Sequence, residues 1–109
     1  MRIIDMQHNF FENLDVPRNE KEARFLEFHK NNPKVYHLFD QFTQQAIDSG
    51  YDRIGARLIL ERIRWEANIT TKDKDFKLND HYIAYYARRW MKQNPEHQGL
   101  FKTKPVEGE

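Results

Sequence analysis

The chain has no cysteine, a single serine, four glycines and four prolines among its 109 residues. Without cysteine it forms no disulfide framework and no thiolate metal site, which suits a reducing compartment. The serine, Ser49, has no nucleophile motif around it, and the glycines are too scattered for a phosphate-binding loop. No run approaches the ~20 apolar residues of a membrane-spanning helix. We therefore expect a soluble, cytoplasmic, non-enzymatic protein without a cofactor.

Histidine and acidic residues provide no metal-binding pattern either. The chain contains no HExxH motif and no two histidines spaced four apart. The five histidines are His8, His29, His37, His81 and His97. Asp73 and Asp75 stand in a polar stretch that is typical of an exposed loop. We expect no bound metal.

Aromatic residues, in contrast, are plentiful. They make up 14% of the chain, beside a hydrophobic fraction of 39% and a charged fraction of 32%. Because Phe, Tyr and Trp each bury a large area, this composition favours a folded domain with an aromatic core over disorder. The length fits one domain. We assign it to residues 19–104, with an N-terminal arm over residues 1–18 and a polar tail over residues 105–109.

Two helices are predicted in the first half of the chain. The first opens at Asn19, a good N-cap with Glu22 at the spacing of a capping box, and ends before Pro33. The second has the clearest helical period and ends at Gly50, which suits the residue after a helix. Its apolar stripe consists of Val35, Leu38, Phe39, Phe42 and Ala46.

A third helix is predicted over residues 54–67, and it is apolar on two sides. One stripe consists of Ala56, Ile59, Leu60, Ile63 and Ala67. Leu58 and Trp65 fall on the opposite side, where they would leave an apolar patch unless something covers them. We favour the N-terminal arm as the cover, and a homodimer is the alternative.

The fourth predicted helix, within residues 77–92, has two faces of opposite character. Asn79 is a suitable N-cap, Asp80 suits the positive end of the helix dipole, and Pro95 follows the helix. A step of about 100° per residue defines one face for the core. That face consists of Ile83, Tyr86, Ala87, Trp90 and Met91. The other face, predicted to contact a partner, consists of His81, Tyr85, Arg88 and Lys92, with Tyr82 and Arg89 at its edge.

Positive charge gathers toward the C-terminal end of the chain. The whole chain has a net charge of +1, whereas residues 77–104 have a net charge of +4. The basic residues of this range are Lys77, Arg88, Arg89, Lys92, Lys102 and Lys104, against the acidic Asp80 and Glu96. This distribution is the kind that nucleic-acid binding requires, although a solvated basic face explains it as well.

The order of elements predicts a mainly α fold of about four helices, with at most one small β-hairpin, of a winged or modified helix-turn-helix kind. The hairpin would pair residues 76–78 with residues 101–103. In this fold the fourth helix enters the major groove of DNA. The residues expected on bases or backbone are His81, Tyr85, Arg88, Arg89 and Lys92, with Lys102 and Lys104 along the phosphates. About ten residues separate the third and fourth helices, more than the three or four usual in this motif.

A second hypothesis therefore stays open, a protein-interaction module with Tyr82 and Tyr85 as anchors. Several stretches also resemble a group of small proteins encoded by bacteriophages and prophages. They are Phe28–Tyr36, Ile54–Ala56, Ile63–Glu66, Phe76–Asn79, Tyr86–Arg88, Pro95 and Gly99–Phe101. The resemblance covers about residues 25–104 and implies a phage or prophage setting in the host cytoplasm, with no functional residue assigned. In that setting the protein partner would be a host defence or replication protein.

Overall fold

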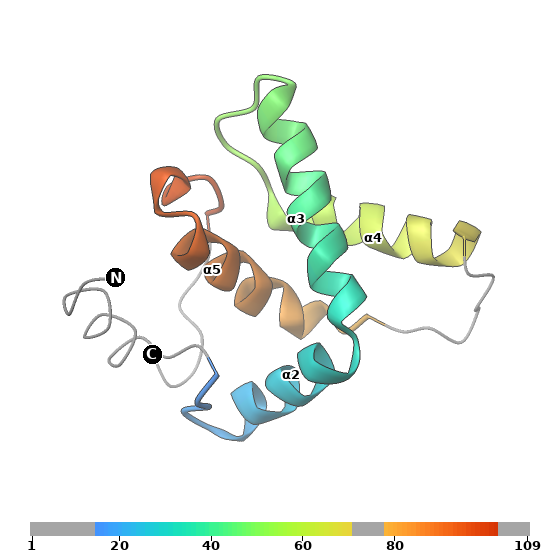
Figure 1. The fold of residues 1–109 in the computed structure, drawn as a ribbon, viewed down its shortest axis with the longest axis vertical. Coiled ribbons are helices and arrows are strands. Elements are labelled where there is room, and N and C mark those ends of the chain that lie inside the picture. Colours follow the sequence, from blue (N-terminus) through green and yellow to red (C-terminus); the bar gives the residue numbers. More distant parts are fainter. Residues whose placement is uncertain (1–14, 71–77, 103–109) are drawn as a thin grey trace, which may run out of the picture.

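The computed structural model describes residues 15–70 and 78–102. In this part the chain forms four α-helices and two short 3₁₀-helices (Figure 1). Their order is α2 (Glu20–Asn31), α3 (Pro33–Asp48), α4 (Ala56–Thr70), η1 (Asp80–Tyr82), α5 (Ile83–Gln93) and η2 (Pro95–His97). The mainly α fold is therefore confirmed. None of these helices is long and apolar enough to cross a membrane.

The predicted caps at Asn19, Gly50 and Asn79 are confirmed, whereas α4 begins two residues later and ends three residues later than the predicted range of 54–67. Asn19 caps α2, because its Oδ1 accepts a hydrogen bond from the backbone N of Glu22 at 2.9 Å. Gly50 follows α3 with φ of 103°, a left-handed conformation that glycine adopts without steric cost. The Oδ1 of Asn79 accepts from the backbone N of His81 at 2.8 Å. The fourth predicted helix therefore starts as η1 and continues as α5.

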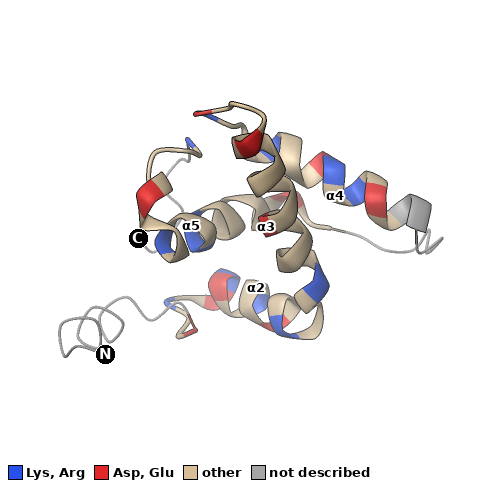
Figure 2. Cartoon of the chain, turned by 45° about the horizontal axis from the view of Figure 1, so that its top comes forward, with Lys and Arg blue, Asp and Glu red and all other residues tan. Residues whose placement is uncertain are grey.

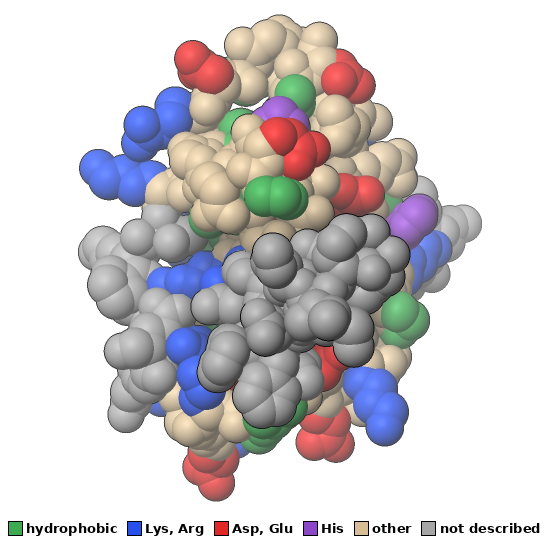
Figure 3. Space-filling model, turned by 60° about the vertical axis from the view of Figure 1, so that its left-hand side comes forward, with side chains coloured by type: hydrophobic (Ala, Val, Ile, Leu, Met, Phe, Trp, Pro, Cys, Tyr) green, Lys and Arg blue, Asp and Glu red, His purple; other side chains and the backbone are tan. Residues whose placement is uncertain are grey.

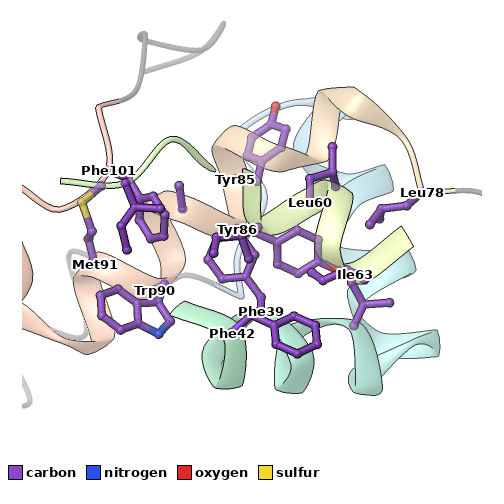
Figure 4. Close-up of a cluster of buried hydrophobic side chains, with 14 of the residues drawn as sticks. Phe39, Phe42, Leu60, Ile63, Leu78, Tyr85, Tyr86, Trp90, Met91 and Phe101 are labelled. Atoms are coloured by element: carbon purple, nitrogen blue, oxygen red, sulfur yellow. The ribbon is translucent and has the colours of Figure 1, made fainter. Parts of the chain in front are cut away.

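Helix α5 supplies much of the hydrophobic core. Tyr86, Ala87 and Trp90 are completely or almost completely buried, and Met91 is buried beside them. Figure 4 shows Tyr86 lying close to Phe39 of α3, and their ring centroids are 5.8 Å apart. The core face predicted for this helix is confirmed, with Ile83 half-buried at its start. The predicted stripe of α4 is confirmed as well, since Ile59, Leu60, Ile63 and Ala67 are buried and Ala56 is half-buried.

Trp90 also links α5 to α3 through a polar contact. Its indole N–H donates a hydrogen bond to the Oδ1 of Asp40 at 2.8 Å. The whole Trp90 side chain is 0% exposed. A buried indole N–H without an acceptor would lose its hydration without compensation. Asp40 therefore allows the largest core side chain to lie between the two helices without this cost.

The segment after α5 returns to the start of α4. The backbone N of Ile54 donates to the carbonyl oxygen of Leu100 at 2.9 Å, and Ile54 forms an isolated parallel bridge with Phe101. Among the described residues Phe101 pairs with Ile54 and Leu78 forms no bridge, so the predicted hairpin of residues 76–78 with 101–103 is not seen in this part of the chain. The Phe101 ring is buried edge-on against Trp90, with ring centroids 5.9 Å apart. Residues 76, 77 and 103 lie outside the described residues.

Removal of the Asp40 carboxylate is expected to destabilise the fold. We predict that Asp40→Ala lowers the free energy of unfolding by about 1 to 2 kcal/mol, because the buried N–H of Trp90 loses its acceptor. Asp40→Asn keeps an acceptor oxygen and should lose less. Chemical denaturation measures both, with the exposed neighbour Gln41→Ala as control. Equal stability of Asp40→Ala and Gln41→Ala would contradict this role of Asp40.

Candidate interaction surfaces

The face of α5 that the sequence assigned to a partner is partly covered by α2. Tyr85 is only 8% exposed, because the ring of Phe25 stacks on it with centroids 5.0 Å apart. The expectation that Tyr85 faces solvent is therefore wrong. The helical period of α5 identifies one buried face, but it carries no signal of a second helix packing on the other side. In Figure 4 the Tyr85 ring accordingly points away from Tyr86 and Trp90.

Several rings join α2 to α3 and α5, and we call them the α2 aromatic cluster. Its members are Phe25, Phe28, His29, Tyr36, Tyr82, Tyr85 and Tyr86. Tyr82, predicted at the edge of the binding face, is half-buried in this cluster, with its ring centroid 5.1 Å from that of Phe28. Burial raises the pKa of Tyr36 to about 12, so its hydroxyl stays protonated and donates a hydrogen bond to the side-chain oxygen of Gln93.

Arg89 is also part of the interior. It is 8% exposed, its guanidinium donates to the Oδ1 of Asp15 at 2.7 Å, and it lies 6.0 Å from the ring centroid of Tyr36. A guanidinium tolerates burial when a carboxylate and an aromatic face replace its hydration. The expectation that Arg89 stands at the edge of an open binding face is therefore wrong.

The remaining residues that were predicted to contact a partner do not form one continuous surface, because the buried Tyr85 and Arg89 lie between them in the sequence. His81, Lys92 and Lys102 are exposed, and Arg88 is half-buried. Lys104 lies outside the described residues. On the described part of one face of the molecule, Figure 3 shows both basic and acidic side chains. Because a recognition helix must expose one whole face to a groove, α5 is poorly placed to act as one.

The outer side of α4 has the opposite character. Leu58 is 59% exposed and Trp65 is 65% exposed, on the side of the helix away from its buried stripe. The sequence prediction of a second apolar side is confirmed, and no described residue covers it. The predicted cover, residues 1–14 of the arm, lies outside the described residues. We call Leu58, Glu61, Arg62 and Trp65 the α4 outer face. Figures 1 and 2 show the C-terminal half of α4 extending past α3 and α5.

Charges of both signs surround these two apolar residues, and basic and acidic positions are interspersed along α4 (Figure 2). Glu61 lies 3.2 Å from a guanidinium nitrogen of Arg64 and 3.8 Å from one of Arg57. Arg62 lies 3.9 Å from Glu66. The arginines of this helix are therefore matched by carboxylates, and they do not form a basic stripe for phosphates.

Arg64 also forms hydrogen bonds that the sequence does not reveal, because the acceptors belong to a distant segment of the chain. Its guanidinium donates to the carbonyl oxygen of Leu78 at 2.6 Å and to the carboxylate of Asp80. The hydrogen bond from Arg64 holds the pKa of the Asp80 carboxyl below its usual range, with the positive charges of Arg64 and Arg57 adding to the effect. These contacts position the start of η1 against α4.

No group of three or more acidic or histidine side chains among the described residues is placed to hold a metal ion. No protein-family model, curated protein or solved structure matches this chain.

Helix α2 also carries a titratable group into the α2 aromatic cluster. His29 is half-buried, stacked on Phe25 at 5.9 Å and edge-on to Tyr36 at 5.4 Å between ring centroids. Burial lowers the pKa of His29 from its ordinary value of 6.5, and the positive charge of Arg89 lowers it further, while Asp15 opposes the shift. The folded protein therefore favours neutral His29.

A pair of substitutions on α5 distinguishes a core cation from a surface cation. We predict that Arg89→Ala lowers the free energy of unfolding by about 2 kcal/mol, because it removes a buried stem and a paired guanidinium. Lys92→Ala, at an exposed position, should change it by less than about 0.5 kcal/mol. Urea denaturation of both variants checks this, and equal effects would show that Arg89 is not part of the interior.

The pH dependence of stability tests His29. Because the pKa of His29 is lower in the folded than in the unfolded chain, the unfolded chain binds more protons between the two values. The contribution of neutral His29 is therefore fully present above about pH 6.5 and is lost as the pH falls through the folded pKa. We expect His29→Gln to lose less stability than the wild type on acidification from pH 7 to pH 5. Exposed His37→Gln should follow the wild type, and parallel curves for all three proteins would contradict the burial argument.

Proposed function

We propose that this chain is a non-enzymatic protein-interaction module whose contact surface is the α4 outer face, with Trp65 as its anchor. The observation that carries the proposal is the exposure of Trp65, a large apolar ring that is 65% exposed to water. Tryptophan is among the residues most enriched at the energetic centres of protein interfaces.

Leu58 extends this anchor into a stripe. It is seven residues from Trp65, so the two side chains stand on one side of α4 about 10 Å apart along the helix axis. Single exposed apolar residues are common on protein surfaces, whereas an aligned pair on one helix face is typical of helix docking. Glu61 and Arg62 beside the stripe supply the kind of polar rim that surrounds the apolar centre of an interface.

The same geometry favours a protein partner over DNA. Tyr85 and Arg89, two of the residues expected at a groove, are buried in the fold. The arginines of α4 lie beside Glu61 and Glu66. Contacts between these arginines and DNA phosphates would therefore add little to the affinity for DNA. The resemblance to phage-encoded proteins adds a host defence or replication protein to this proposal as a target.

Capture from host extract with matched variants tests the proposal. The tagged wild type is compared with Trp65→Ser and with Tyr51→Ser, a control that removes an aromatic ring 55% exposed outside α4. We expect a partner that the wild type and Tyr51→Ser retain and Trp65→Ser loses. The purified partner should then bind Trp65→Ser more weakly by about 2 kcal/mol, with little dependence on salt.

A gel shift with mixed-sequence duplex DNA at ~50 mM salt supplies the opposing outcome. Duplex binding that falls steeply with salt, is lost in a Lys92→Ala and Lys102→Ala double variant, and is unchanged in Trp65→Ser would contradict the proposal and restore the DNA hypothesis.

A further inference from the structure

We propose that the α4 outer face binds a second copy of this chain, with the two α4 helices side by side and parallel. This inference rests on the proposed protein-binding role of that face and adds a second copy of the chain to its partners. It is carried by the way in which Glu61 and Arg62 flank the apolar stripe.

The flanking positions follow from helix geometry. With about 100° per residue, Leu58 and Trp65 lie within about 20° of each other around α4. Glu61 and Arg62 then lie about 50° to either side of the stripe, and as adjacent residues they differ in height by only about 1.5 Å. The face therefore has a negative flank and a positive flank at almost the same level, and both side chains are at least half exposed.

A two-fold axis parallel to α4 brings opposite flanks together. Leu58 then meets Leu58 of the second copy, and Trp65 meets Trp65. Glu61 of each copy faces Arg62 of the other, so two ion pairs form at once, as an isologous interface requires. An antiparallel pair that matches Leu58 with Trp65 instead places Glu61 opposite Glu61 and Arg62 opposite Arg62. The charges thus select the parallel arrangement.

The ion pairs within one copy do not prevent this exchange. Glu61 lies 3.2 Å from Arg64 and 3.8 Å from Arg57, and Arg62 lies 3.9 Å from Glu66, all at exposed or partly exposed side chains. The guanidinium of Arg62 also lies 4.5 Å from the centroid of the Phe42 ring, and its side chain is still 50% exposed. Such pairs hold a side chain weakly in water. A partner of a single charge sign, such as a nucleic acid or an acidic peptide, would meet repulsion on the Glu61 flank. A second copy meets none.

The area of the α4 outer face determines how tightly two copies bind each other. A fully buried Trp side chain removes about 150 to 250 Å² from water. Two copies of Trp65 and Leu58 together therefore stay well below the ~1,200 Å² of total buried surface found in stable complexes. We expect a reversible dimer that forms at high micromolar concentration.

Sedimentation equilibrium of the full chain between ~10 µM and ~1 mM tests the pair. The average mass should rise toward that of a dimer for the wild type, and Trp65→Ser should remain monomeric. Glu61→Arg and Arg62→Glu should each raise the dissociation constant at least about tenfold, because each turns two attractions into repulsions. A mixture of these two variants should associate at least as tightly as the wild type. The control is Glu20→Arg, which makes the same charge change on exposed α2.

Cross-linking reports the orientation, because the natural chain has no cysteine. Leu58→Cys should form a disulfide with itself under mild oxidation, whereas Tyr51→Cys should not. Absence of this disulfide at a concentration at which Leu58→Cys sediments as a dimer would overturn the parallel arrangement. A wild type that stays monomeric at ~1 mM would overturn the dimer, while a partner lost by Trp65→Ser would still support the proposed protein-binding function.

Discussion

The burial of Trp90 between α5 and α3 is the contact on which the rest of the structure depends. It is the largest buried side chain, and its N–H reaches Asp40 at 2.8 Å. With this side chain inside, Tyr86 of the same helix lies against Phe39, and the ring of Phe101 packs edge-on against the indole. Phe101 in turn brings the C-terminal segment to Ile54 at the start of α4. One large ring thereby connects three segments that are distant in sequence.

The placement of α2 decides what α5 can do. Phe25 covers Tyr85, and the guanidinium of Arg89 is enclosed between Asp15 and Tyr36. A helix enclosed in this way presents separate cations and no continuous reading face. Its mixed polar and aromatic composition suits a central helix with neighbours on more than one side. Each neighbour buries, or forms hydrogen bonds with, a different set of its side chains.

Helix α4 has the complementary arrangement, with one side in the core and the other in water. Ile59, Leu60 and Ile63 anchor it to the core, while Arg64 ties its middle to Leu78 and Asp80. These contacts hold the helix in a fixed orientation, so Leu58 and Trp65 are presented outward on a rigid element. An interface built on such an element loses less conformational entropy on binding than one built on a loop.

The sequence by itself determined the four helices, their caps at Asn19, Gly50 and Asn79, the core faces of α4 and α5, and the second apolar side of α4. These features depend on local hydrogen bonds and on the helical period, which neighbouring residues specify. Only the tertiary structure decided that Tyr85 and Arg89 are interior, that Arg64 holds Asp80, and that Phe101 pairs with Ile54. Each of these features depends on residues far apart in the chain. The helical period shows which face of a helix is apolar, but it does not show how many neighbouring elements cover the helix.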